Sequence, residues 1–154
     1  MQVERVSPCS IVDPGHFVNA AKREAQSDPR GLFADQFENE ANFRAHFSTT
    51  GPEIWTQTGG KIDAFVAASG TGGTIAGVSR YLKQQNDKIK AYLVDPPGSG
   101  LYNKVVKGVM YAQTEAEGTR RRHQVDTITE GIGINRITAN FEQAALDGAF
   151  KVDI

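Results

Sequence analysis

The middle of the chain alternates between apolar runs and an amphipathic segment. Residues 62–68 form a short apolar run of the kind that buried parallel strands show. Ile75, Val78 and Leu82 follow at helical spacing and mark one apolar helix face. A second apolar run covers residues 89–94. This pattern predicts a strand–helix–strand unit with parallel strands and a right-handed crossover.

The segments on either side of this unit predict further helices and strands. Before it, we expect a helix from Asp13-Pro14 to Asp28, a strand at 32–37 and a helical region at 43–55 broken at Gly51-Pro52. After it, we expect a helical turn at 105–110, a strand at 125–129, a helix at 141–149 and a strand that begins at 150. The alternation predicts an α/β fold with a mostly parallel open sheet and flanking helices.

A glycine-rich turn at residues 69–74 joins the first central strand to its helix. Its glycines lack the Cβ atoms that would hold a ligand away from the backbone. The N–H groups of Gly72, Gly73 and Thr74 open the helix without partners in it, and the hydroxyls of Thr71 and Thr74 can add hydrogen bonds. The turn is therefore either a phosphate site or a tight connection without a ligand.

Two familiar nucleotide loops do not match this turn. A Walker A loop needs a lysine near its end, and none lies between Lys61 and Lys83. A dinucleotide fingerprint counted from Gly70 needs glycine or alanine where Ile75 stands. Asp95 could imitate the ribose-binding acid of that fingerprint, but two prolines follow it directly. A single phosphate fits the turn better than a pyrophosphate.

Amide side chains and a second glycine turn add candidate binding groups. Gln36, Asn39 and Asn42 follow the strand expected at 32–37, and open parallel sheets bind ligands at such strand ends. The alternative is that Asn39 or Asn42 caps the next helix. Gly131 and Gly133 follow the strand expected at 125–129, either to admit a flat ligand or as a plain turn.

Composition excludes several classes of function. The net charge is −1, so the sequence gives no electrostatic reason to expect nucleic acid or an anionic membrane as a partner. Cys9 is the single cysteine, which suits a reducing compartment, and the three histidines lack the spacing of metal ligands. We expect no metal site, membrane span or targeting segment in this chain.

Five motifs, taken in order, resemble the cysteine synthase family. They are QFENEAN at 36–42, TTGPEIW at 49–55, GTGGT at 70–74, DPPGSG at 95–100 and EGIG at 130–133. The family consists of pyridoxal-phosphate (PLP) enzymes of the tryptophan synthase β-like fold, fold type II. The resemblance covers essentially the whole chain, and its nearest branch is the fungal cysteine synthase-like proteins. It implies one partial domain over residues 1–154, incomplete at both ends.

The resemblance also implies roles for individual residues. The phosphate of pyridoxal 5′-phosphate would be bound by Gly70, Thr71, Gly72, Gly73 and Thr74. Gln36 would line the pocket of a small amino-acid substrate. Gly131, with Ile132, would pack near the cofactor ring.

The activity implied by the resemblance is β-replacement, in which O-acetylserine or serine and sulfide give cysteine. This is transferase or lyase chemistry of cysteine biosynthesis. The intact family member is expected to be a homodimer in the cytoplasm or the mitochondrion. Two alternatives stay open: a cystathionine β-synthase or dehydratase-like enzyme, and a non-catalytic fragment that binds phosphate or pairs with a relative.

Three family features have no match in this sequence. They are the Ser-x-Lys-x-Arg motif with the Schiff-base lysine, the Ser/Thr-Ser-Gly-Asn-Thr loop that binds the substrate carboxylate, and the C-terminal serine-rich turn. We therefore assign no catalytic residue. We expect the chain to correspond to the middle of the family's fold and to be inactive in cysteine synthesis when isolated.

Overall fold

The computed structural model describes residues 3–7, 9–110, 129 and 131–152, which divide into two compact units, Met1–Asp35 and Gln36–Ile154. The first unit contains one helix, α1 (Phe17–Ser27). It begins later than Asp13-Pro14, because the His16 side chain accepts the N–H of Val18 at 3.2 Å and caps the helix. Asp13 instead accepts the N–H of Gly15 at 2.7 Å in the preceding turn.

The strand predicted at 32–37 is wrong. No strand is assigned there, and the apolar side chain of Leu32 is 87% exposed. Asp35 has a φ of 48°, a left-handed conformation that an extended strand cannot contain. The segment is apolar in sequence, but none of the three described strands pairs with it.

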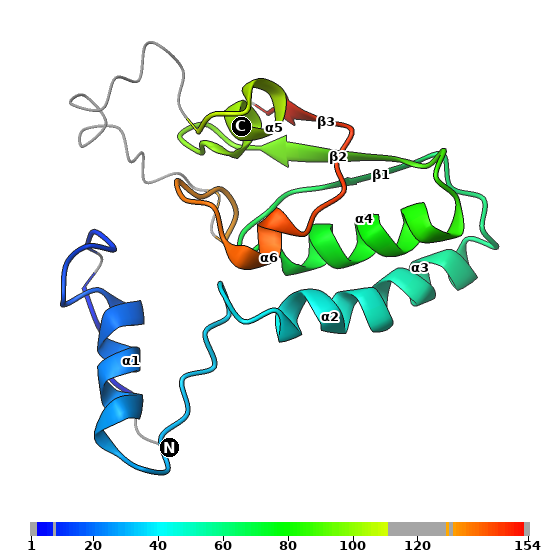
Figure 1. Ribbon diagram of the computed structural model, residues 1–154. Helices are drawn as coiled ribbons and strands as arrows, with labels where there is room; N and C mark the ends of the chain where they lie inside the picture. Colours follow the sequence, from blue (N-terminus) through cyan, green and yellow to red (C-terminus); the bar gives the residue numbers. More distant parts are fainter. Residues whose placement is uncertain (1–2, 8, 111–128, 130, 153–154) are drawn as a thin grey trace. The chain divides into compact units, whose positions relative to one another are not determined.

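The second unit is built on a parallel sheet of three strands in the order β1 (Ala64–Ala67), β2 (Lys90–Asp95) and β3 (Gly148–Lys151). Helix α4 (Gly73–Gln85) connects β1 to β2, so the predicted strand–helix–strand unit with parallel strands is confirmed. Figure 1 shows α4 along the sheet, with α2 (Ala41–Ser48) and α3 (Thr50–Gln57) packed on its other side.

The predicted apolar face of α4 makes the core of this unit. Ile75, Val78 and Leu82 are each at most 1% exposed. Ile75 packs with Leu93 of β2, with Leu101 of α5 (Leu101–Lys107) and with Phe141 of α6 (Ala139–Glu142). Val78 and Leu82 form a second cluster with Ile89, against which Trp55 packs.

One face of the sheet is uncovered, although β1 was predicted to be buried. Val66 is 53% exposed and Phe150 is 56% exposed. Val66 lies in register with Tyr92, whose ring lies 5.4 Å from that of Phe150. We call Val66, Tyr92 and Phe150 the open face. Because strand side chains alternate, Phe65 and Ala67 point the other way, into the core.

The helical region predicted at 43–55 is divided, but the predicted position of the break at Gly51-Pro52 is wrong, because the break lies at Thr49, between α2 and α3. Pro52 is the third residue of α3, where a helix needs no N–H donor. Helix α2 crosses α4 at Gly77. A Cβ on Gly77 would lie 2.6 Å from the backbone nitrogen of Phe47.

The helix predicted at 141–149 is wrong, since α6 ends at Glu142 and β3 already begins at Gly148. The N–H of Asp147 donates to the carbonyl of Ala91 at 2.8 Å, which draws the chain to the sheet. The helical turn predicted at 105–110 is part of α5, which ends before Gly108 at φ 77°. The strand predicted at 125–129 lies outside the described residues except for Thr129, which is not in a strand.

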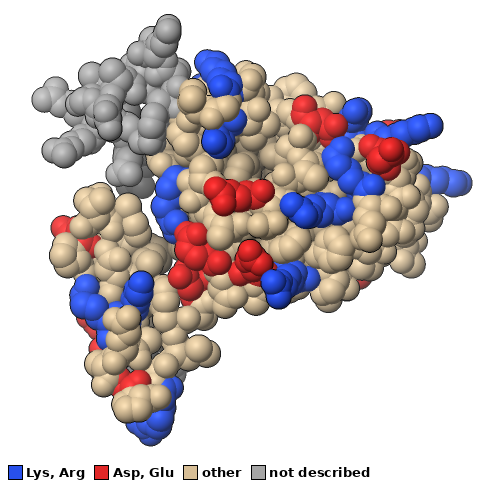
Figure 2. Space-filling view, viewed as in Figure 1, with Lys and Arg blue, Asp and Glu red and all other residues tan. Residues whose placement is uncertain are grey.

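Charged side chains of both signs are interspersed on the face shown in Figure 2. Asp147 makes two of the ion pairs, with the Nζ atoms of Lys83 at 2.6 Å and Lys90 at 3.2 Å. The Lys83 ammonium, with the N–H of Ala91, lowers the pKa of Asp147 to about 2. Because its pKa is lower in the folded state, the carboxylate stabilises the fold above about pH 4. This contribution is lost as the pH falls towards 2.

Asp147→Asn is expected to lower the free energy of unfolding at pH 7 by about 1–2 kcal/mol, because it removes hydrogen bonds to charged groups at the sheet. Urea unfolding at pH 7 and at pH 2.5 measures the effect, and the difference from wild type should shrink at the lower pH. Asp87→Asn, at an exposed position after α4, is the control. An equal loss at both pH values would contradict the assignment.

Candidate functional site

The glycine-rich turn lies where β1 ends and α4 begins. Gly72 has a φ of 93° and precedes the first helical residue, Gly73. The first helical hydrogen bond runs from the N–H of Ala76 to the carbonyl of Gly72 at 3.0 Å. Within the described part of the chain, the N–H groups of Gly72, Gly73 and Thr74 make no hydrogen bond. They form a cluster of donors at the positive end of a 13-residue helix.

The three glycines of the turn are also required by packing. A Cβ on Gly70 would lie 2.2 Å from the carbonyl oxygen of Gly131, and a Cβ on Gly72 would lie 2.6 Å from the backbone of Phe141. At Gly73 it would lie 1.9 Å from Oδ1 of Asn42. The sequence explained these glycines by ligand approach alone. The structure adds that protein atoms occupy the space of all three missing side chains.

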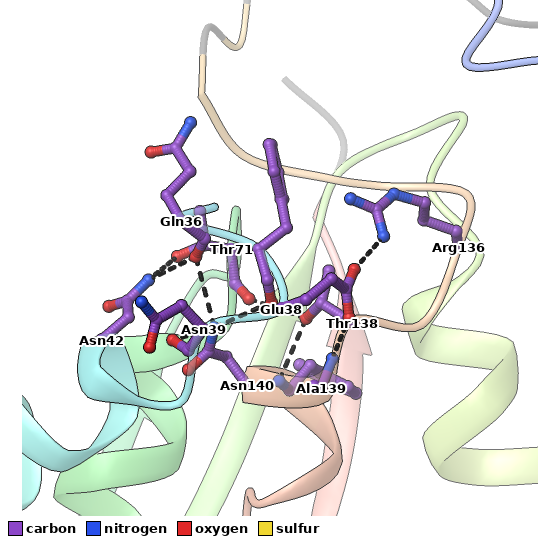
Figure 3. Close-up of polar contacts among 11 residues, drawn as sticks. Gln36, Glu38, Asn39, Asn42, Thr71, Arg136, Thr138, Ala139 and Asn140 are labelled. Atoms are coloured by element: carbon purple, nitrogen blue, oxygen red, sulfur yellow. Dashed lines mark hydrogen bonds and ion pairs between the residues drawn. The ribbon is translucent and has the colours of Figure 1, made fainter. Parts of the chain in front are cut away.

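Two asparagines hold the turn against the segment before α2 (Figure 3). Nδ2 of Asn42 donates to the carbonyl of Gln36 at 2.8 Å and to Oγ1 of Thr71 at 2.9 Å. Nδ2 of the buried Asn140 donates to the carbonyl of Phe37 at 2.7 Å. Its Oδ1 accepts the N–H of Phe43 at 3.0 Å. These two bonds of Asn140 join segments about 100 residues apart.

Helix α6 is fixed to the same turn by Thr138, and to the segment before α2 by Glu38. Oγ1 of Thr138 donates to the carbonyl of Thr71 at 2.7 Å and accepts the N–H of Phe141 at 3.0 Å. Glu38 accepts the N–H of Ala139 at 2.9 Å and pairs with Arg136. Partial burial acts to raise the pKa of Glu38, but the hydrogen bonds from Arg136 and Ala139 outweigh it and lower that pKa.

The three candidate amide side chains have different contacts in the structure. The side chain of Gln36 is exposed, makes no hydrogen bond to a described residue and points away from the polar network in Figure 3. Oδ1 of Asn39 accepts the N–H of Ala41 at 3.0 Å, so Asn39 caps the start of α2, as one alternative predicted. Asn42 is already inside α2 and binds the turn instead. Of these three amides, that of Gln36 alone makes no hydrogen bond to a described residue and is therefore available to a ligand.

His46 is a residue that the sequence did not single out. Its Nε2 lies 3.1 Å from Oγ1 of Thr74, and its Nδ1 lies 2.9 Å from Oγ1 of Thr50. If Thr50 donates to Nδ1, the N–H at Nε2 donates to Thr74, and the hydroxyl proton of Thr74 is left for a ligand. No local signal reveals this, since the contact spans 28 residues.

The second glycine turn meets the first. Gly131 and Gly133 have φ values of 78° and 81°, and the N–H of Gly133 donates to the carbonyl of Ser69 at 2.8 Å. The structure thus brings both turns to the carboxyl end of β1. Asp95, at the end of β2, is 1% exposed and accepts the N–H of Tyr102 at 2.7 Å. Burial raises the pKa of Asp95, and it serves the start of α5 rather than a ribose.

Comparisons with known proteins agree with the five motifs. A family model described as "Pyridoxal-phosphate dependent enzyme" matches residues 5–152. "Cysteine synthase 2" of Schizosaccharomyces pombe is 61% identical over 97% of this chain and 40% of its own length. A Saccharomyces cerevisiae relative, whose name suggests a mitochondrial cysteine synthase, is 59% identical over 98% of this chain and 41% of its own. The chain thus spans about 40% of the length of these curated relatives.

A solved structure supports the same conclusion. An O-acetylserine dependent cystathionine β-synthase from Helicobacter pylori superposes with a TM-score of 0.69 and is 32% identical, over 88% of this chain and 39% of its own. This confirms the α/β fold of the tryptophan synthase β-like type. No helix in the described ranges is long and apolar enough to cross a membrane. On these matches, the chain belongs to the family of pyridoxal-phosphate dependent enzymes.

Proposed function

We propose that this chain carries the phosphate loop and part of the substrate pocket of a PLP-dependent cysteine synthase. The observation that carries the proposal is the donor cluster at the start of α4, where three adjacent N–H groups make no hydrogen bond to any residue that the structure describes. Such a cluster suits one phosphate group. The residues that would hold the phosphate are Gly70, Thr71, Gly72, Gly73 and Thr74.

Hydrogen bonds from neighbouring side chains orient the two hydroxyls of the loop, on Thr71 and Thr74. Oγ1 of Thr71 accepts from Asn42, so its own proton is left to donate to a phosphate oxygen. The carbonyl of Thr71 is fixed by Thr138. These bonds hold the loop in one geometry before the ligand binds, which lowers the entropic cost of binding.

When bound, PLP supplies an electron sink for bond changes at the α and β carbons of an amino acid. The chemistry would be β-replacement, in which O-acetylserine or serine and sulfide give cysteine. Gln36 has a free amide with which to bind the amino-acid substrate. Gly131 and Ile132, beside the first turn, would border the ring. Homodimerisation, and a cytoplasmic or mitochondrial location, belong to this proposal for the whole protein.

A second candidate function comes from the solved structure, which is described as a cystathionine β-synthase that depends on O-acetylserine. In that case a thiol-bearing amino acid would replace sulfide as the second substrate. The same loop and the same Gln36 would serve both reactions. Product analysis with sulfide and with homocysteine, in a protein that turns over, separates the two. That the isolated chain forms no cysteine stays a prediction.

The test of the phosphate loop is to titrate the chain with PLP and with pyridoxal, which lacks the phosphate. We expect PLP to bind about 100-fold more tightly, a difference of about 2.7 kcal/mol, because the loop recognises the phosphate. Tyrosine and tryptophan fluorescence reports binding, and inorganic phosphate should compete. Equal affinity for both compounds, without competition by phosphate, would remove the basis of the proposal.

A further inference from the structure

Ser69 is a buried serine whose hydroxyl has no partner. Its residue is 2% exposed, and Oγ makes no hydrogen bond to any described residue. A buried hydroxyl without a partner destabilises a protein, so native structures contain few of them. The hydroxyl of Ser69 therefore destabilises the ligand-free fold, and no contact with a described residue compensates for this loss.

Ser69 lies two residues after the end of β1 and three residues before Gly72, which precedes α4. In β1, Phe65 and Ala67 pack into the core that contains Ile75 of α4. The same alternation, extended two residues past the end of β1, would place the side chain of Ser69 on this side of the sheet. The backbone of Ser69 is fixed, because its carbonyl accepts the N–H of Gly133 at 2.8 Å. Along the chain, Ser69 lies between Ala67, the last residue of β1, and Gly73, the first residue of α4.

We propose that Ser69 is a further binding residue of this site and that its hydroxyl donates a hydrogen bond to the phosphate of the bound ligand. The inference rests on the proposed function, because it needs a phosphate at the start of α4. Rotation about the Cα–Cβ bond of Ser69 moves Oγ between staggered positions, and in the bound state it faces the phosphate. The unpartnered N–H groups and the hydroxyl then share one acceptor.

If this assignment is right, removing the hydroxyl of Ser69 should raise the stability of the ligand-free chain and lower its affinity for phosphate. Ser69→Ala removes an unpartnered hydroxyl and leaves the carbon skeleton in place. The ligand-free chain should unfold at a higher urea concentration than the wild type. The same variant should bind PLP and inorganic phosphate about 10-fold more weakly, as expected for one lost hydrogen bond to a charged group.

Ser79 provides a matched control in the same unit. It is also fully buried, but its Oγ donates to the carbonyl of Ala76 at 3.2 Å and accepts the N–H of Ala145 at 3.1 Å. Ser79→Ala should therefore lower the unfolding midpoint and leave phosphate affinity within about twofold. Ser69→Cys, which keeps a group of similar size with a weak donor, should bind phosphate more weakly than wild type.

The outcomes separate the two proposals. If the wild type binds neither PLP nor phosphate, the proposed function and the role of Ser69 both fall. If the wild type binds and Ser69→Ala and Ser69→Cys bind equally well, only the role of Ser69 falls. A third outcome is that a Ser69 variant loses stability as Ser79→Ala does while keeping its affinity for phosphate. That result would show that the hydroxyl of Ser69 stabilises the fold and does not bind the ligand. Gain of stability together with loss of affinity supports the assignment.

Discussion

Valine in place of Gly73 is expected to weaken PLP binding by about 100-fold or more, equivalent to at least about 2.7 kcal/mol. The structural reason is indirect. A Cβ at this position would lie 1.9 Å from Oδ1 and 2.4 Å from Cγ of Asn42. Asn42 would have to leave, and with it the hydrogen bond that orients the hydroxyl of Thr71. The fluorescence titration with PLP measures the loss.

A double-mutant cycle tests whether the effect passes through Asn42. The three heavy atoms nearest to the added carbon all belong to the Asn42 side chain. Gly73→Ala should therefore weaken PLP binding strongly in the wild type and much less in an Asn42→Ala background. An equal effect in both backgrounds would mean that the added carbon acts on the ligand directly.

Gly77→Val is expected to lower the free energy of unfolding by about 3 kcal/mol, the largest single effect on stability that we predict. A Cβ on Gly77 would lie 2.6 Å from the backbone nitrogen of Phe47 and 2.7 Å from the carbonyl oxygen of Phe43. Backbone atoms of α2 cannot move away by a change of rotamer, as side-chain atoms can. The two helices would have to move apart and lose packing along their length. Urea unfolding at pH 7 measures this effect.

Gln84→Val is the matched control, because it introduces the same side chain at an exposed position of the same helix. It should change the free energy of unfolding by no more than about 0.5 kcal/mol. A loss for Gly77→Val no larger than that of the control would show that α2 and α4 are not in close contact at this crossing.

Local patterns were sufficient to predict the central unit. The apolar spacing of Ile75, Val78 and Leu82 and the turn before them each depend on neighbours within a few residues. Asn39 was likewise open to prediction as a cap, because capping acts over two or three residues. Their positions at the ends of expected strands marked Gln36 and Gly131 as candidate binding residues, and the family motifs added the specific roles proposed for them.

Other features depended on contacts between distant segments. Asn140 binds the segment before α2 across more than 100 residues, and the residues next to it in the sequence do not predict that contact. The predicted helix at 141–149 failed for the same reason, because Asp147 is held by β2 and by two lysines. The strand at 32–37 was predicted from its apolar residues alone, but no strand among the described residues pairs with this segment, and Leu32 is exposed. The periodicity of apolar residues indicates which secondary structure a segment prefers, but not which other segments it packs against.

The open face has a consequence for how this chain's stability is defined. Val66, Tyr92 and Phe150 place an aliphatic and two aromatic side chains together on one side of a parallel sheet. Any molecule that covers them, a second copy included, binds the folded form and not the unfolded form. Mass action then couples folding to concentration. Unfolding midpoints measured for this chain describe a single molecule only if they stay constant on dilution.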